Sequence, residues 1–125
     1  MLQDKAAMAT VAVKDIKAAS RFYEGTLGLK VIDGPEASVR AYRTGSSTLL
    51  VYESQYAGTN KGTAVTWPVG ADIDGVAQAL KAKGVAFERY DFPGMTRQGD
   101  LHVTGSMKVA WFKDPDGNIH SLINR

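Results

Sequence analysis

The chain has 125 residues, enough for one domain, and its hydrophobic fraction of 44% is ordinary for a globular protein with a packed core. Fifteen basic and 13 acidic residues leave a net charge of only +2, and no run of Lys or Arg marks a nucleic-acid surface. No apolar stretch approaches the ~20 residues that cross a bilayer, no signal core is present at the N-terminus, and cysteine is absent. We therefore expect a cytoplasmic protein with no nucleic-acid or membrane partner.

The first half of the chain predicts a strand, a helix and three further strands. Val11 and Val13 alternate with small residues, as in a half-buried strand, and Asp15 follows where a carboxylate can cap a helix. Apolar residues recur at helical spacing from Ile16, and Gly28 suits the left-handed residue that ends a helix. The three strands expected after this helix span residues 29–32, 38–44 and 47–54.

The second half repeats this order, which indicates a duplicated unit. Val65 and Trp67 open a strand, Asp72 is expected to cap a helix, and Gly84 is expected to end it. Each half is therefore predicted to be a βαβββ unit. The later strands of the second half are expected at 85–87, 107–113 and 118–124, with a tight turn at 114–117. We assign residues 5–54 to module 1, 55–62 to a linker and 63–125 to module 2.

A segment without a counterpart in the first half, residues 89–106, interrupts the second one. We expect a long irregular insertion, because loops of this length in a compact domain are often functional or mobile. It carries Phe92, Arg97, Asp100 and His102. These side chains could fold over a cavity as a lid, where Arg97 could recognise an anionic or carbonyl group.

The tandem βαβββ pattern, together with "FYEGTLGL" (22–29) and "FKDPDGN" (112–118), resembles the vicinal oxygen chelate superfamily. That superfamily includes glyoxalase I, extradiol dioxygenases, fosfomycin-resistance transferases and bleomycin-resistance proteins. The resemblance covers essentially the whole chain. It implies one α+β domain over residues 1–125, in which two module sheets curve into a partial barrel with a metal or a bulky ligand on the concave face. It also implies a homodimer.

Metal-dependent members of the superfamily take one ligand from the first and one from the last strand of each module. By this resemblance the positions fall on Met8, Leu50, Ala64 or Val65, and Ser121. Zn, Ni, Mn and Fe sites need imidazole and carboxylate donors, and none of these side chains supplies one. We therefore expect no metal or other cofactor, with a divalent ion in a shifted register as the alternative.

The concave face is predicted to be largely apolar with a few hydroxyl groups. If Val11 and Val13 face the first helix, strand alternation leaves Met8 and Thr10 on the concave side. Such a lining suits an organic ligand of moderate size. Aromatic candidates near the cavity mouth are Tyr42, Trp67, Phe92 and Trp111, although both tryptophans could equally be core residues. The predicted ligand-binding residues are Met8, Thr10, Leu50, Tyr52, Thr66, Trp67, Phe92, Arg97, His102, Trp111 and Ser121.

The leading interpretation is metal-independent binding of an apolar or aromatic small molecule, as in bleomycin-resistance-type members. The alternative is an enzyme, either a glyoxalase-like lyase or isomerase or another member with a non-standard site. For that alternative the candidate catalytic residues are His102, Asp100 and Ser121. The preferred interpretation of His102 is nevertheless a solvated loop histidine, and a concave Ser121 places His120 on the opposite face of its strand. A degenerate scaffold that acts through partners is a third possibility, and the sequence does not name the ligand.

Overall fold

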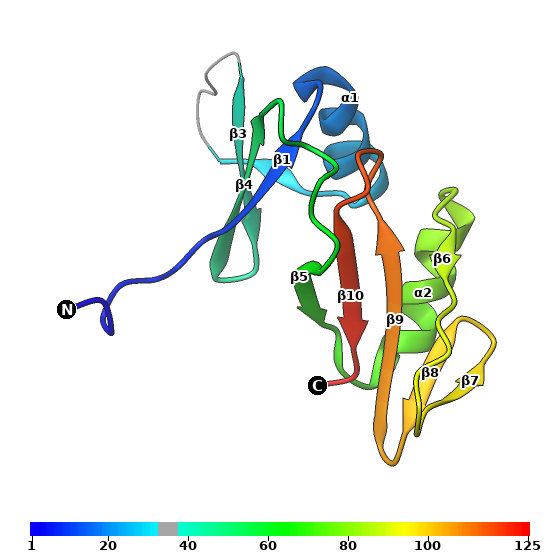
Figure 1. Ribbon diagram of the computed structural model, residues 1–125. Coiled ribbons are helices and arrows are strands. Elements are labelled where there is room, and N and C mark those ends of the chain that lie inside the picture. The colour runs from blue at the N-terminus through cyan, green and yellow to red at the C-terminus, as the bar shows by residue number, and fades with distance from the viewer. Residues whose placement is uncertain (33–37) are drawn as a thin grey trace.

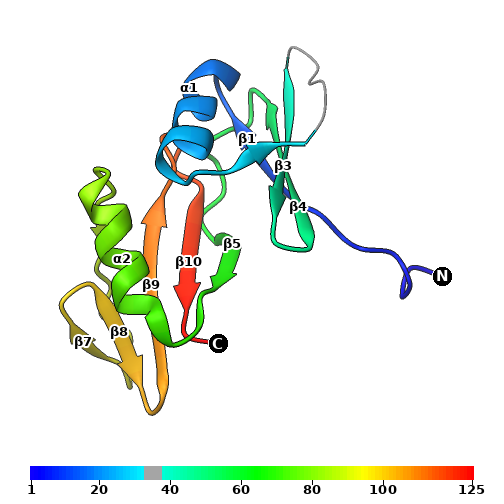
Figure 2. The same cartoon turned by 180° about the vertical axis from the view of Figure 1, so that it is seen from behind.

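The computed structural model describes residues 1–32 and 38–125, and it contains two β-sheets with both helices against one side of them (Figures 1 and 2). The predicted α+β class is therefore confirmed, although the two sheets are not closed into a barrel. The N-terminal sheet contains β1 (Ala9–Val13), β2 (Lys30–Val31), β3 (Val39–Thr44) and β4 (Ser47–Glu53). The C-terminal sheet contains β5 (Thr63–Pro68), β6 (Phe87–Glu88), β7 (Thr96–Gln98), β8 (Leu101–Thr104), β9 (Met107–Lys113) and β10 (Ile119–Ile123). No helix in the described part of the chain is long and apolar enough to cross a membrane.

The duplication read from the sequence is visible in the strand order. The N-terminal sheet has the order β1-β4-β3-β2, and the C-terminal sheet repeats it as β5-β10-β9-β6. In both sheets the first strand of the unit runs parallel to the last one, β1 beside β4 and β5 beside β10. Each sheet thus contains the strands of one βαβββ unit, and the C-terminal sheet carries β7 and β8 in addition.

The insertion at 89–106 is irregular only in its first half, whereas we expected it to be irregular throughout. Its second half forms the β7–β8 hairpin, and β8 pairs with the part of β9 that the short β6 leaves free. The segment forms a strand because its apolar residues alternate: Leu101 and Val103 pack in the C-terminal core, while the side chain of His102 between them points to the other face of the sheet. The hairpin therefore extends the sheet instead of folding over a cavity.

The first helix forms where its cap and apolar spacing predict it. In α1 (Ile16–Ser20) the Asp15 carboxylate accepts a hydrogen bond from the Lys17 amide at 3.0 Å, as expected of an N-cap. The helix then widens into the π-helical turn η1 (Arg21–Thr26), which the sequence pattern did not indicate. Gly28, with φ of 74°, ends it in the left-handed conformation that glycine adopts without strain.

The second helix begins differently from our expectation. Asp72 stands at the N-cap of α2 (Ile73–Ala82), but its side chain makes no capping hydrogen bond. The reason is the preceding 3₁₀ turn η2 (Gly70–Asp72), which gives Asp72 a φ of −87° and a ψ of 26° instead of the extended backbone of a capping residue. The predicted end at Gly84 is confirmed, with φ of 94°.

Two adjoining apolar clusters fill the space between the sheets and the helices. Val11 and Val13 face α1, as predicted, and are almost completely buried. Phe22, Leu27 and Trp67 pack against both clusters and so join the two halves. The N-terminal cluster contains Val11, Val13, Ile16, Ala19, Tyr23, Tyr42, Leu49, Val51 and Val65, and the C-terminal one Ile73, Ala77, Val85, Leu101, Ala110, Phe112 and Leu122.

A buried carboxylate connects the two signature segments. The Tyr23 hydroxyl, from the first segment, donates to Asp114 Oδ2 of the second at 2.8 Å. The Asn118 side chain donates to the same oxygen at 2.8 Å and to the Ala12 carbonyl at 2.7 Å, while the amides of Asp116 and Asn118 donate to Asp114 Oδ1. Burial, and then the Asp114 charge, raise the pKa of Tyr23 far above its usual range, so its hydroxyl stays protonated and keeps donating.

We expect Tyr23→Phe to lower the free energy of unfolding by about 2 kcal/mol, because it removes a buried hydrogen-bonding group from a charged partner. Urea unfolding at pH 7 measures the loss. The control is Tyr56→Phe, whose side chain is exposed and which should change the value by less than about 0.5 kcal/mol. Equal losses in the two variants would contradict the importance of this contact.

Candidate functional site

The face of each sheet that turns away from the helices, which we call the open face, carries most of the predicted ligand-binding residues. In β1 the inward packing of Val11 and Val13 leaves Thr10 on the open face, opposite Leu50 of β4. Tyr52 lies two residues further along β4 and is 39% exposed. These residues lie on the face that strand alternation predicts, and their role in ligand binding stays a prediction.

The open face of the C-terminal sheet carries a short polar strip. Ser121 of β10 lies between Thr66 of β5 and Trp111 of β9, and its hydroxyl donates to Thr66 Oγ1 at 2.9 Å. In β5, Val65 enters the core, whereas Ala64, where the pairing with β10 is irregular, is partly buried beside the N-terminal cluster and lines both hollows described below. The ligand position left open between Ala64 and Val65 therefore falls on Ala64.

The side chains at the four superfamily ligand positions do not fit a divalent metal. They are a thioether, Met8, which is half exposed just before β1, and the alkyl, methyl and hydroxyl groups of Leu50, Ala64 and Ser121. Within residues 1–32 and 38–125, no three His, Asp or Glu side chains are grouped so that they could hold a metal ion.

Two hollows adjoin the place where β1 and β5 meet, and both are lined by Ala64. The first has a volume of about 610 Å³ and is lined by the β3–β4 turn and β5, including Arg43, Thr48, Thr66 and Trp67. The second, of about 220 Å³, is lined by β1, β4 and the linker. We call the two together the intersheet hollow. The side chains that line its second part include Thr10, Tyr52, Tyr56 and Asn60.

A third hollow, of about 380 Å³, lies at the insertion, and we call it the aromatic hollow. It is lined by Phe92, Pro93, Gly94, Met95, Thr104 and Trp111. The predicted site residues are thus not gathered in one cavity. Four of them line the intersheet hollow (Thr10, Tyr52, Thr66, Trp67), two line the aromatic hollow (Phe92, Trp111), and Met8, Leu50, Arg97, His102 and Ser121 line none of the three.

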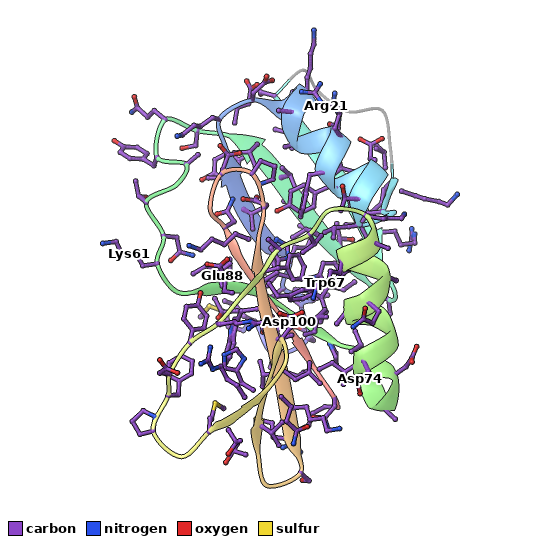
Figure 3. The ribbon with its side chains drawn as sticks, turned by 90° about the vertical axis from the view of Figure 1, so that its right-hand side faces the viewer. Arg21, Lys61, Trp67, Asp74, Glu88 and Asp100 are labelled. Carbon is purple, nitrogen blue, oxygen red and sulfur yellow. The ribbon has the colours of Figure 1, made fainter. Side chains whose placement is uncertain are left out.

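Trp67 and His120 form a hydrogen-bonded pair on neighbouring strands, with His120 completely and Trp67 partly buried, and Figure 3 shows Trp67 in the middle of the molecule. The Trp67 indole N–H donates to His120 Nδ1 at 3.0 Å, and the two rings are stacked. Since an indole only donates, the imidazole proton is on Nε2, which donates to the Tyr23 hydroxyl at 3.1 Å. His120 therefore points to the helix side, as expected from a concave Ser121, and Trp67 belongs mainly to the core.

The acid/base candidates from the insertion are wrong as accessible groups. His102 is completely buried in β8, and its Nε2 accepts a hydrogen bond from the Tyr90 amide at 2.9 Å, so it is not a solvated loop histidine. Asp100 binds Lys81 at 2.9 Å and Arg89 at 3.3 Å, and these cations, Lys81 first, hold the pKa of its carboxyl below the usual range. Asp100 is therefore a structural ion-pair residue.

Two further expectations about the cavity mouth need correction. Tyr42 is completely buried on the helix side of β3, where it stacks on Tyr23 and donates to Glu24 at 2.9 Å. Arg97 is exposed and lies 3.6 Å from the Asp91 carboxylate. The alternation that buries Tyr42 also exposes its neighbour Arg43 on the open face, opposite Thr48, so the β3 pattern could have identified Arg43 in advance.

Comparison with known proteins agrees with this geometry. The model of the Glyoxalase/Bleomycin resistance protein/Dioxygenase superfamily matches residues 5–121, and the chain belongs to that superfamily. An integron cassette protein from the mobile metagenome of the Halifax Harbour sewage outfall is similar in structure, with a TM-score of 0.72, 18% identity and coverage of 98% of this chain and 99% of that one.

Two other solved structures carry names that refer to an activity. Lactoylglutathione lyase from Agrobacterium tumefaciens has a TM-score of 0.71 and 16% identity, covering 98% of this chain and 95% of that one. The fosfomycin resistance protein FosX from Mesorhizobium loti has a TM-score of 0.68 and 16% identity, covering 100% and 94%. At these identities the likeness shows the fold alone. No curated protein sequence matches the chain.

The buried position of His120 predicts a loss of stability in acid. Burial lowers the pKa of His120 from 6.5 to about 4, against the opposing effect of Asp114. As the pH falls from 6.5 towards 4, the unfolded chain binds a proton that the folded chain does not. This difference should remove about 3 kcal/mol of stability across that interval and nothing above it.

The measurement is urea unfolding of the native chain and of His120→Gln at pH 7 and pH 4.5. Carboxylates other than those at the His120 site titrate alike in both proteins, so the difference between them reports His120. We expect the variant to be less stable at pH 7, and the gap to narrow by about 2 kcal/mol at pH 4.5. A gap that stays constant would show that His120 is not held neutral by its surroundings.

Proposed function

We propose that the protein binds a small organic molecule in the intersheet hollow without using a metal ion. The observation that carries this proposal is the set of side chains at the four superfamily ligand positions: Met8, Leu50, Ala64 and Ser121. None of them is an imidazole or a carboxylate. Ala64 lines both parts of the hollow, so the region that would adjoin a metal presents a methyl group instead.

The lining of the hollow suits a ligand of moderate size with some polar groups. A volume of about 610 Å³ lies within the ~300–1,000 Å³ typical of small-molecule sites. Trp67 and Tyr52 supply aromatic surface, and Thr48 and Thr66 supply hydroxyl groups that can donate or accept. Arg43 is the basic side chain in the lining and could hold a carbonyl or an anionic group of the ligand.

The alternative function, a glyoxalase-like lyase or isomerase, receives less support from the site. Names such as lactoylglutathione lyase and fosfomycin resistance protein belong to structures of similar fold and point to small-molecule substrates for those proteins. A comparable reaction here would need an acid or base on an open face. Asp100 is held by Lys81 and Arg89, and His102 is buried, so neither supplies one.

The proposal is tested by metal analysis and thermal shift on the same purified protein. We expect less than about 0.1 Zn, Ni, Mn or Fe per chain. We also expect at least one compound from a panel of aromatic metabolites, bleomycin and fosfomycin to raise the melting temperature, because a ligand of the folded state raises its stability. This rise should persist in EDTA. Arg43→Ala should reduce that shift several-fold, whereas Arg21→Ala, on the outer side of the first helix, should not (Figure 3). One tightly bound metal per chain, with stabilisation lost in EDTA, would overturn the proposal.

We also propose that two chains associate through their open faces. Tyr52 and Met8 expose large apolar side chains there, and the sheets of a single chain are not closed into a barrel. Light scattering after size exclusion should give twice the 13.4 kDa of one chain at about 50 µM protein. Leu50→Glu, a change on the same face outside the hollows, should give the single-chain mass. A native chain with the single-chain mass at that concentration would contradict the dimer.

A further inference from the structure

The aromatic hollow is separate from the intersheet hollow and has its own chemistry. Its lining combines two aromatic rings, Phe92 and Trp111, with the Met95 thioether and one hydroxyl, Thr104. Phe92 is 45% exposed, so its ring is accessible to a ligand. These groups offer flat, polarisable surface rather than charge.

The rings belong to a larger cluster that the insertion builds on the open face of β9. Tyr90, Phe92 and Trp111 contact each other with centroid distances of 5.4–5.5 Å. Under them lies His102, whose ring is 4.8 Å from that of Trp111 and nearly perpendicular to it. The cluster therefore surrounds one polar side chain with aromatic rings.

His102 carries a hydrogen-bond donor that the described chain does not use. Because its Nε2 accepts from the Tyr90 amide, the proton of the neutral ring is on Nδ1. Nδ1 is buried and has no hydrogen-bond partner among the described residues. A buried donor left unpaired is costly, and such groups are rare in folded proteins without a functional reason. His120, the other histidine, has both ring nitrogens paired.

The segment above His102 is the part of this cluster that can give way. Residues 89–95 lie between β6 and β7 and belong to no helix or strand, whereas His102 and Trp111 are fixed in paired strands. A small shift of the Phe92 ring could therefore open the way from the aromatic hollow to His102 without breaking the sheet. Asp91 on this segment pairs with Arg97 of β7, so the surroundings favour an uncharged ligand.

We propose that the aromatic hollow binds a flat, uncharged aromatic molecule that carries a carbonyl acceptor. Its ring lies against Trp111 and Phe92, and its carbonyl accepts the unused Nδ1 proton of His102. This inference rests on the proposed function in one respect, that the chain holds an organic ligand, but it places that ligand class at a second position.

Coumarin is a suitable probe, because it is flat, uncharged and has one exposed carbonyl. In two-dimensional ¹H–¹⁵N spectra of the full chain, coumarin should shift the Trp111 indole and the His102 imidazole signals. The Trp67 and His120 signals should not move, since neither side chain lines the aromatic hollow. Indane, which lacks the carbonyl, and δ-valerolactone, which lacks the aromatic ring, should each bind at least fivefold more weakly.

Three variants separate the contributions. Phe92→Leu, at an exposed position that does not endanger folding, and Trp111→Leu should weaken coumarin binding about fivefold or more. His102→Phe keeps a ring but loses the donor, and should bind coumarin no better than indane. Phe87→Leu removes a ring from the helix-covered face of the same sheet and should leave binding unchanged.

The results also separate this inference from the proposed function. Coumarin shifts confined to residues of the intersheet hollow, such as Ala64 and Thr66, would overturn the aromatic site while supporting the proposed function. Coumarin binding that survives Phe92→Leu and Trp111→Leu, or no coumarin binding at all, would also overturn the aromatic site. Neither outcome bears on the Arg43→Ala result, which tests the intersheet hollow on its own.

Discussion

The structure depends on a chain of hydrogen bonds that runs from the Trp67 indole through His120 and Tyr23 to Asp114. Each group in it has one role: the indole can only donate and the buried carboxylate only accepts, so the direction of every proton between them follows. The chain connects the π-helical turn of the first half to β5, β10 and the final turn of the second. It fixes how the two halves meet, and therefore which strand faces remain open for a ligand.

Much of the fold could be predicted because its signals are local. Alternating residues such as Val11 and Val13, the Asp15 cap, and glycines at the helix ends each depend on a few neighbouring positions, and the second half repeats most of them. The superfamily motifs are of the same kind. Tyr23, Asp114 and Asn118 carry the resemblance because they hold the scaffold together, and for that reason they say nothing about which molecule the chain binds.

The site could be predicted only in part, because it depends on contacts between distant segments. Alternation placed Thr10, Tyr52, Thr66 and Ser121 on the correct faces, but it could not show that Phe92 and Trp111 line a hollow of their own. Asp100 and His102 looked like a catalytic pair because they are close in sequence. In the structure the Asp100 carboxylate is paired with Lys81, on a helix almost 20 residues earlier in the chain, and His102 is covered by the rings of Tyr90, Phe92 and Trp111. The two side chains therefore do not form a catalytic pair.

The β7–β8 hairpin has a consequence for the solubility of the folded chain. Without it, β6 would cover only two residues of β9, and the rest of that strand would present a long unpaired edge to other molecules. Such an edge is a template for strand addition and aggregation. The hairpin replaces it with β7, three exposed polar residues that include Arg97, and a short charged strand of this kind is a poor template for any further strand.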